Sequence, residues 1–370
     1  KGVEFLLKKN KVTYFKGTGK LKSPSEITIV DKENKETNIK SDNIIISTGS
    51  EPASLPGIAF DEEKIISSTG ALSLKSVPKK MIVVGGGYIG LEMGSVWSRL
   101  GSEVHVVEFL DHITPGMDKE ISNEFMKILK KQGLNFHLET KVEKISKSKN
   151  GVIIETSDKK GKKIKFESDV VLISVGRKPY TKNLNLEKVG IELDEKKRIK
   201  VSKNYQTNIK NIYAIGDVIE GPMLAHKAEE EGIAVAELIS GQSGHVNYEV
   251  IPGVIYTTPE VASVGKTEEQ LIEKNQKYKI GKFPFMANSR AKAIDEPDGF
   301  VKILADATTD KVLGVHLIGP HAGELIAEMA IAMEFGASSE DIARTCHAHP
   351  TFSEAVKEAA LSVEKRQIHS

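Results

Sequence analysis

A glycine-rich run with the spacing of a dinucleotide-binding turn lies between an apolar stretch, residues 81–84, and a helical pattern. Its glycines occupy the first, third and sixth positions. The first permits a tight turn, the second lets the backbone approach a pyrophosphate, and the third lets the helix pack closely on the strand. The N-terminus of that helix then faces the phosphates. We therefore predict a dinucleotide site at Gly85, Gly87, Tyr88, Ile89 and Gly90.

An acidic residue supports this interpretation over a simpler one, in which three glycines only make a flexible turn. Glu108 ends the next predicted strand, about 20 residues beyond the glycines, where a carboxylate accepts hydrogen bonds from ribose hydroxyls. The same charge would repel a 2′-phosphate, so NAD is favoured over NADP. Glu92, on the first turns of the helix, is a candidate for contact with the nicotinamide. The alternative for Glu92 is an ordinary surface charge on a helix.

A histidine and a glutamate near the C-terminus have the spacing of a proton-transfer pair. An imidazole accepts protons near neutral pH, and a carboxylate on its other ring nitrogen fixes the tautomer and orientation. Pro350 lies between His349 and Glu354, so the chain can fold the carboxylate back onto the imidazole. Cys346, His347 and His349 could instead suggest a metal site, but these three ligands crowd together without a fourth. We therefore predict no metal, and we expect Cys346 and His347 to be packing residues.

The composition limits the classes of function. The chain has 370 residues, enough for two or three domains, and a net charge of +1. This balance does not favour a nucleic-acid or membrane-surface partner, both of which usually require a basic excess. No apolar run approaches the roughly 18 residues of a membrane span, and no secretory signal is visible. Cys346 is the only cysteine, so these residues cannot by themselves form a dithiol redox pair.

Apolar runs alternate with helical patterns along the chain, which predicts an α/β fold. Strands are expected at residues 12–15, 27–30, 43–47, 81–84, 104–108, 135–138, 170–174, 253–256, 278–285, 299–305 and 312–318. Helices are expected at residues 119–132, 225–240, 324–335 and 353–363, and directly after the glycine-rich run.

Several motifs give the chain a resemblance to a known family. Besides the glycine run with Glu108, they are Ser47-Thr48-Gly49-Ser50, Gly176-Arg177-Lys178-Pro179, Ala214-Ile215-Gly216-Asp217, Met223-Leu224-Ala225-His226 and the segment from Cys346 to Glu354. With these motifs the chain resembles the pyridine nucleotide–disulfide oxidoreductases over its whole length, and among them the dihydrolipoamide dehydrogenases. The His347-Ala348-His349 triplet is similar to the lipoamide enzymes. Glu108 argues against the NADP-dependent alternatives, such as reductases that act on glutathione or mercury.

This resemblance implies an FAD-binding domain that is interrupted by an inserted NAD-binding, Rossmann-like domain and followed by an α+β dimerisation domain. The expected FAD-binding segments are residues 1–50 and 179–245, with the NAD-binding segment at 51–178 and the dimerisation segment at 246–370. FAD and NAD are the implied cofactors, and a homodimer is the implied assembly.

The resemblance also implies roles for particular residues. Asp217 would bind the ribityl chain of FAD, and Gly17 would lie near its adenosine. Further cofactor contacts are implied for Thr48 and Gly49 at the flavin junction, for Val142 and Gly176 beside NAD, and for the backbone of Met223, Leu224, Ala225 and His226 at the flavin ring. His349, oriented by Glu354, would remove thiol protons, because the thiolate is the reactive form. It would serve the flavin site of the partner subunit.

The resemblance begins partway into the family pattern. A complete member opens with a strand, a second glycine fingerprint for the ADP half of FAD and a helix with two cysteines, on the order of 100 residues in all. None of these occurs in the chain, which begins at Lys1. We therefore expect the chain as given to lack bound FAD and dihydrolipoamide oxidation. The FAD-domain strands would lack a central neighbour, and such exposed strand edges promote aggregation.

The activity implied by the resemblance is oxidation of dihydrolipoyl groups, with FAD as relay and NAD⁺ as acceptor. Implied partners are a second copy of the chain and the lipoyl domains and core acyltransferase of 2-oxoacid dehydrogenase complexes, without nucleic acid or membrane. The implied compartment is the bacterial cytoplasm or the mitochondrial matrix. The alternative from a different functional class is a binding or assembly module, which keeps NAD binding and the dimer surface but has no catalytic activity.

Overall fold

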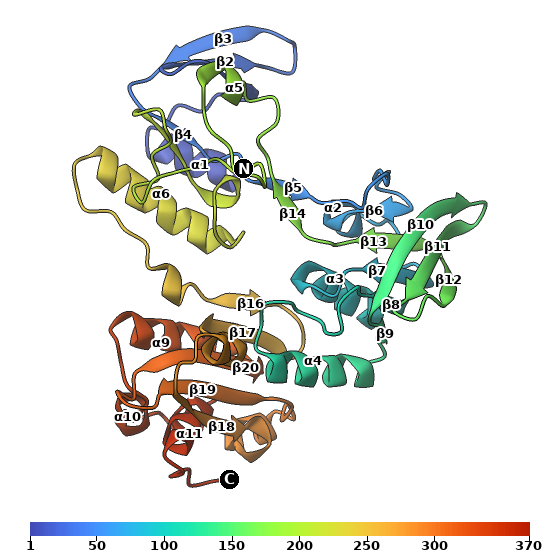
Figure 1. The fold of residues 1–370 in the computed structure, drawn as a ribbon, viewed down its shortest axis with the longest axis vertical. Coiled ribbons are helices and arrows are strands. Elements are labelled where there is room, and N and C mark those ends of the chain that lie inside the picture. Colours follow the sequence, from blue (N-terminus) through green and yellow to red (C-terminus); the bar gives the residue numbers. More distant parts are fainter. The chain divides into compact units, whose positions relative to one another are not determined.

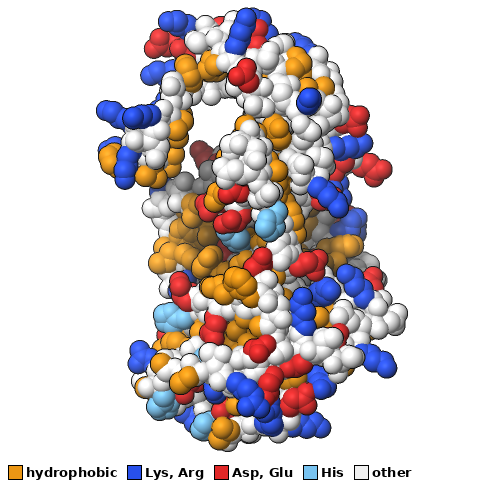
Figure 2. Space-filling view, turned by 90° about the vertical axis from the view of Figure 1, so that its left-hand side faces the viewer, with side chains coloured by type: hydrophobic (Ala, Val, Ile, Leu, Met, Phe, Trp, Pro, Cys, Tyr) orange, Lys and Arg blue, Asp and Glu red, His pale blue; other side chains and the backbone are white.

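The computed structural model describes residues 1–370, which divide into two compact units (Figure 1). Unit one consists of Lys1–Glu51 and Arg177–Val246, and unit two consists of Pro52–Gly176 and Asn247–Ser370. Both units mix helices with strands, as the alternating pattern predicts. No helix has the length and apolarity needed to cross a membrane. On the face drawn in Figure 2, basic and acidic side chains are interspersed, in keeping with the net charge of +1.

Unit one contains a three-stranded antiparallel sheet and a two-stranded parallel sheet. The first consists of β1 (Thr18–Ser23), β2 (Glu26–Val30) and β3 (Glu36–Lys40), and the second of β4 (Ile44–Ile46) and β15 (Ile212–Ala214). A short pair, β5 (Ser50–Pro52) with β14 (Arg177–Pro179), a 3₁₀ turn η1 (Gly216–Val218) and the helices α1 (Gly2–Lys9), α5 (Leu186–Val189) and α6 (Ala225–Ile239) complete it. Strand β4 alternates, because Ile44 and Ile46 are buried in the core and Ile45 is exposed.

The strand predicted at residues 12–15 is wrong. These residues form no regular element, and the side chains of Val12, Tyr14 and Phe15 are exposed. The first strand begins instead at Thr18, which pairs with Val30 of β2. β-propensity mainly reflects packing against neighbouring strands, so the apolar residues at 12–15 do not form a strand without a partner.

Unit two begins with a five-stranded parallel sheet in the order β6-β13-β7-β8-β9. Its strands are β6 (Ile65–Ile66), β7 (Lys80–Val84), β8 (Glu103–Val107), β9 (Asn135–His137) and β13 (Val170–Ile173), and its helices are α2 (Ser68–Ala71), α3 (Tyr88–Arg99) and α4 (Lys119–Lys131). Every residue of β13 is buried, as expected for a parallel strand covered on both faces. The antiparallel strands β10 (Thr140–Ser148), β11 (Gly151–Asp158) and β12 (Lys163–Ser168), which the sequence reading missed, pack against this sheet.

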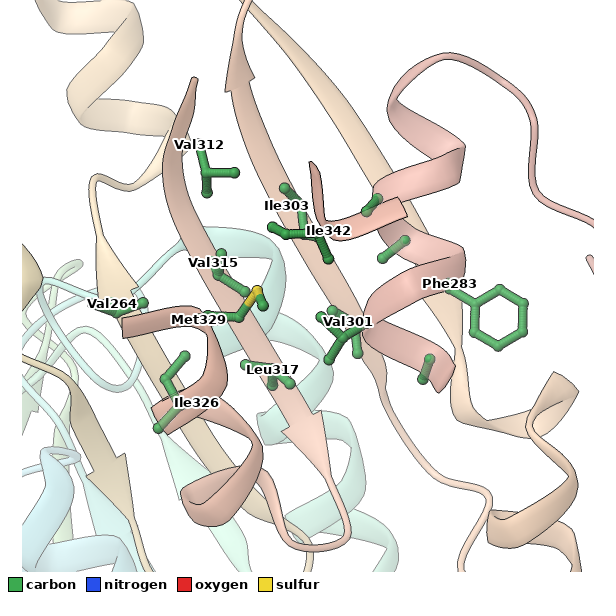
Figure 3. Packing of buried hydrophobic residues seen from close by; sticks show 14 of the residues in the cluster. Val264, Phe283, Val301, Ile303, Val312, Val315, Leu317, Ile326, Met329 and Ile342 are labelled. Carbon is green, nitrogen blue, oxygen red and sulfur yellow. The ribbon is translucent and has the colours of Figure 1, made fainter. Parts of the chain in front are cut away.

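The rest of unit two is a five-stranded antiparallel sheet in the order β16-β17-β20-β19-β18. Its strands are β16 (Gly253–Ile255), β17 (Glu260–Gly265), β18 (Tyr278–Pro284), β19 (Phe300–Asp306) and β20 (Val312–Gly319). Around it lie η2 (Tyr248–Val250), α7 (Glu268–Glu273), η3 (Phe285–Ala287), α8 (Ser289–Ala293), α9 (Ala322–Glu334), α10 (Ser339–Arg344) and α11 (Ser353–Val363). Figure 3 shows the core between sheet and helices, where Val315 and Leu317 of β20 face Ile326 and Met329 of α9.

A buried charge cluster connects the two parts of unit two. Lys302, on β19 of the antiparallel sheet, is fully buried and lies 3.0 Å from Asp118, which caps the N-terminus of α4. Its ammonium group also lies 2.6 Å from Glu268 and 3.3 Å from Glu120. Burial would lower the pKa of Lys302, but the hydrogen bonds to Glu268 and Asp118 raise it above its ordinary value. The cluster therefore fixes α4 to the antiparallel sheet through a charged lysine.

Candidate nucleotide-binding and proton-transfer sites

The candidate nucleotide site is a cavity of about 760 Å³ in unit two, at the carboxyl ends of β13, β7 and β8. Parallel α/β sheets bind ligands at this edge, where the helix N-termini also lie. The structure brings most of the predicted NAD residues together here, since the lining includes Gly85, Gly87, Tyr88, Ile89, Glu108, Val142 and Gly176. Lining residues that the sequence reading missed include Leu55, Pro56, Ile58, Phe109, Thr140, Ser174 and Val175.

Two glycines of the run, Gly85 and Gly90, occupy positions where a larger residue would clash with backbone atoms. Gly85 has a φ of +105°, and a Cβ on it would lie 2.4 Å from the carbonyl oxygen of Ser174. A Cβ on Gly90 would lie 2.3 Å from the carbonyl oxygen of Gly85, so only glycine lets the helix pack this closely on the turn. Gly90 itself does not line the cavity. Gly87, by contrast, has open space where its Cβ would be, which leaves room for a phosphate group. The turn therefore fits a dinucleotide.

Glu108 is held in the cavity wall by backbone groups. Its side chain is buried, with Oε2 accepting the N–H of Gly86 at 2.6 Å and Oε1 accepting the N–H of Leu110 at 2.8 Å. These two bonds fix the plane of the carboxylate beside the glycine turn. A carboxylate oxygen accepts more than one hydrogen bond, so Glu108 can still bind ribose hydroxyls.

Glu92 lies on α3, the helix that follows the glycine run, but it does not line the cavity. Its Oε1 accepts the backbone N–H of Tyr256, next to β16, at 2.8 Å. Burial raises the pKa of Glu92, although the N–H of Tyr256 opposes the shift. The structure thus gives Glu92 a contact with the antiparallel part of unit two, and its contact with the nicotinamide stays a prediction.

The residues predicted for FAD lie in unit one, and Asp217 has the most defined surroundings. It follows β15 in the turn η1, where its Oδ2 accepts the hydroxyl of Ser50 at 2.5 Å. Arg177 holds this serine through two hydrogen bonds. Its Nε donates to the hydroxyl of Ser50 at 2.7 Å, and its Nη2 donates to the carbonyl oxygen of Ser50 at 2.9 Å. The sequence reading missed Ser50 and Arg177 as partners of Asp217. Since a carboxylate has several acceptor positions, Asp217 fits a polyol chain such as ribityl.

A buried ion pair on α6 holds the turn that carries Asp217. Lys227 and Glu231 are both fully buried and lie 2.9 Å apart. Glu231 accepts the N–H of Gly216 at 2.7 Å, and Lys227 donates to the carbonyl oxygen of Gly216 at 3.1 Å. Gly216 has a φ of +74°, which favours glycine. One pair of charges therefore fixes the peptide groups on both sides of this glycine, directly before Asp217.

The other predicted FAD residues are more dispersed within unit one. Thr48 donates its hydroxyl to the carbonyl oxygen of Tyr180 at 2.7 Å, and Gly49 has a φ of +71°. The predicted flavin-ring residues Met223, Leu224, Ala225 and His226 lie at the start of α6, with Leu224 as its N-cap. Gly17 lies at a different sheet, where a Cβ would meet the carbonyl oxygen of Val30 at 2.5 Å. These residues therefore lie on several different elements of unit one.

His349 and Glu354 form the predicted pair. His349 lies in the loop between α10 and α11, and its Nδ1 lies 2.9 Å from Oε1 of Glu354. Oε2 of Glu354 accepts the backbone N–H of Thr351 at 2.9 Å. Burial would raise the pKa of Glu354, but the N–H of Thr351 and the bond to His349 lower it. With the carboxylate on Nδ1 and an imidazole side chain that is 69% exposed, Nε2 is accessible to a substrate proton.

The neighbours of His349 differ from expectation. Cys346 is exposed, so its assignment as a packing residue is wrong. The side chain of His347 is 5% exposed and is bonded through both ring nitrogens, which is more than packing. No group of three or more histidine, cysteine, aspartate or glutamate residues is arranged to hold a metal ion.

Two family models match the chain. Residues 1–232 match the pyridine nucleotide-disulphide oxidoreductase model, and residues 251–360 match the dimerisation domain of the same family. Among curated relatives, a mitochondrial dihydrolipoyl dehydrogenase from Pisum sativum is 58% identical over 100% of this chain and 74% of its own length. A dihydrolipoamide dehydrogenase from Chaetomium thermophilum is 57% identical over 100% of this chain and 74% of its own. A leghemoglobin reductase from Glycine max is 58% identical over 98% and 69%.

Solved structures agree with these matches. LpdA from Mycobacterium tuberculosis superposes with a TM-score of 0.89 at 26% identity, covering 97% of this chain and 79% of that one. The flavoprotein disulfide reductase RclA from Escherichia coli gives 0.87 at 27% identity, covering 97% and 82%. The matches confirm the predicted family and α/β class, the oxidoreductase activity, and FAD and NAD as the cofactors that the family uses. The chain belongs to the pyridine nucleotide–disulphide oxidoreductase family.

Proposed function

We propose that the protein oxidises dihydrolipoyl groups and delivers the electrons to NAD⁺, as the names of its relatives suggest. The observation that supports this proposal most is the hydrogen bond between His349 and Glu354, since an exposed imidazole oriented by a carboxylate suits removal of a thiol proton. The dithiol loses two protons and two electrons and becomes a disulfide. FAD, when bound, supplies the two-electron relay from the thiols to NAD⁺.

In this proposal the chain's own residues perform the proton transfer. Glu354 keeps the proton of His349 on Nδ1, so the lone pair of Nε2 faces outward and accepts the proton of the thiol. The ring then becomes an imidazolium, which the negative charge of Glu354 stabilises. The bond from Thr351 keeps Glu354 ionised by lowering its pKa. The positive charge that develops on the base is therefore balanced by a carboxylate already in place.

The nucleotide residues have a different role. We propose that Gly85, Gly87 and the start of α3 bind the pyrophosphate of NAD, while Glu108 binds a ribose. Val142 and Gly176, in the same cavity wall, would contact the rest of the dinucleotide. In unit one, Ser50, Arg177 and the Lys227–Glu231 pair would orient Asp217 toward the ribityl chain of FAD.

Glu108 leads to a prediction about the choice of nucleotide. The wild-type protein should bind NADH on the order of 10-fold or more tightly than NADPH, because the buried carboxylate repels a 2′-phosphate. Glu108→Gln should narrow that gap, and calorimetric titration of both nucleotides measures it. Glu167→Gln is the control, since this glutamate lies on β12, is exposed and pairs only with Lys165. Equal affinities in the wild type would contradict the assignment.

The assembly and compartment extend the proposal. The dimerisation domain supports a homodimer. We propose that the homodimer binds lipoyl domains and the core acyltransferase of a 2-oxoacid dehydrogenase complex. Relatives from Pisum sativum, Arabidopsis thaliana and Dictyostelium discoideum are named mitochondrial, so we propose the mitochondrial matrix rather than a bacterial cytoplasm.

The decisive experiment is an assay of the protein expressed from its complete coding sequence. NADH formation from NAD⁺ should require dihydrolipoamide, and a lipoyl domain carrying the reduced group should replace the free compound. Two relatives are named leghemoglobin reductase, so reduction of a ferric haem protein is the comparison reaction. Haem reduction without dihydrolipoamide oxidation would refute the proposal. Nucleotide binding without either reaction would instead favour an assembly module.

A further inference from the structure

The environment of His347 is unusual for a neutral histidine. Its Nδ1 lies 2.9 Å from the backbone carbonyl oxygen of Thr345, and its Nε2 lies 2.8 Å from Oε1 of Glu328. Both partners are hydrogen-bond acceptors, whereas a neutral imidazole has only one N–H. A neutral ring would therefore point a lone pair at an oxygen atom, and only the imidazolium satisfies both contacts. The imidazole itself is 5% exposed, and the Glu328 side chain that it contacts is 37% exposed.

The charges around this ring come from two helices. Glu328 lies on α9, while Lys357, on α11, donates to the same carbonyl oxygen of Thr345 at 2.8 Å. The hydrogen bond to Glu328 raises the pKa of His347, assisted by the carbonyl of Thr345 and opposed by burial and by Lys357. The carboxylate of Glu328 is thus the group that keeps the ring charged.

This contact ties the loop that carries His349 to a helix outside the loop. The loop runs from the end of α10 at Arg344 to the start of α11 at Ser353. Glu354 orients the ring of His349 from α11, and the hydroxyl of Thr351 donates to the carbonyl oxygen of Ala348 at 2.7 Å. His347 supplies the contact with α9.

We propose that His347 is a positioning residue, whose imidazolium bridges the carbonyl of Thr345 and the carboxylate of Glu328 and thereby places the loop that presents His349 to the thiol. This inference rests on the proposed function, because it assigns His347 a part in the same proton transfer. His347 does not accept the substrate proton itself, since both of its nitrogens are occupied.

The bridge has a pH dependence of known sign. Because folding raises the pKa of His347, its stabilising contribution is fully present below the pKa of an unfolded histidine, about 6.5, and is lost as the pH rises through the folded pKa. Above the folded pKa of His347, the loop that carries His349 should therefore be held less firmly to Glu328. Dithiol oxidation should fall there, while electron transfer from NADH to an artificial acceptor should not.

The activity test uses three variants of the protein expressed from its complete coding sequence. Glu328→Ala removes the acceptor and should lower dihydrolipoamide turnover about 10-fold, while NADH-to-acceptor turnover stays within about twofold. Glu328→Gln keeps a hydrogen bond, because its amide donates to Nε2 of a neutral ring, so it should restore turnover and abolish the alkaline fall. Glu324→Ala is the control, as an exposed glutamate one turn earlier on α9.

Nuclear magnetic resonance of isotope-labelled histidine gives a readout that does not depend on turnover. The His347 signal, assigned with His347→Gln, should titrate above about 6.5 in the wild type and at a lower pH in Glu328→Gln. The inference would be overturned if His347 of the wild type titrated at or below about 6.5. It would also be overturned if Glu328→Ala kept full dihydrolipoamide turnover, or if it lost dihydrolipoamide and NADH-to-acceptor turnover equally. If the wild type does not oxidise dihydrolipoamide, the proposed function fails. The inference then depends on the His349 ring signal, which must change in Glu328→Ala, and an unchanged signal overturns it.

Discussion

Replacing His349 with glutamine should lower dihydrolipoamide oxidation by about 10²- to 10⁴-fold, the usual loss when a general base is removed. The amide of glutamine cannot take a proton from a thiol, so the thiolate must form without assistance. Electron transfer from NADH to an artificial acceptor needs no thiol proton and should stay within about twofold of the wild type. Steady-state rates of both reactions, measured on the protein expressed from its complete coding sequence, test the prediction.

Two further variants separate the role of the base from a general effect on this segment. Glu354→Gln should lower the same reaction less than His349→Gln, because it keeps a hydrogen bond to the ring but not the negative charge that balances the imidazolium. His369→Gln is the matched control, since His369 is also exposed and bonded to a glutamate of α11, Glu358, at 2.8 Å. A dihydrolipoamide rate in His349→Gln equal to the wild type would remove His349 from the mechanism.

The features that the sequence predicts well depend on residues that are close along the chain. The glycine turn, the helix behind it and Glu108 belong to one strand–helix–strand unit, so their spacing alone determines the geometry. His349 and Glu354 are likewise separated by a single loop, and their contact follows from the first turn of α11. Local order of this kind can be read without knowing which elements pack together.

Contacts between distant segments could not be predicted in the same way. Asp217 is oriented by Ser50, which lies far away along the chain on β5, and nothing in the sequence around either residue indicates the pairing. The antiparallel strands β10–β12 were missed because their burial depends on the sheet beneath them. His347 looked like a packing residue because its partner Glu328 lies on another helix. In each case the property belongs to the packed fold rather than to a local pattern.

The charge cluster around Lys302 is a further contact of this kind. Lys302 and Asp118 are far apart along the chain, yet the ammonium group donates to both carboxylate oxygens of Asp118, at 3.1 and 3.0 Å. Burial would raise the pKa of Asp118, but the neighbouring His316 and Lys302 lower it. Because folding lowers the pKa of Asp118, the ionised carboxylate stabilises the fold. This stabilisation is present above the pKa of an unfolded aspartate, about 3.9, and is lost as the pH falls through the folded pKa of Asp118.

Lys302→Met should therefore lower the free energy of unfolding by about 3–5 kcal/mol, the range for removing one partner of a buried ion pair. Methionine fills similar space, so most of the loss comes from Asp118, which is left buried without its cation. Lys279, on the neighbouring strand β18, forms an exposed ion pair with Glu364. Lys279→Met should therefore cost much less than Lys302→Met. Adding Asp118→Asn to Lys302→Met should recover part of the loss, because the unpaired charge is gone. Denaturant unfolding of the four proteins measures these differences, and equal losses for Lys302→Met and Lys279→Met would show that the buried cluster contributes no more than a surface pair.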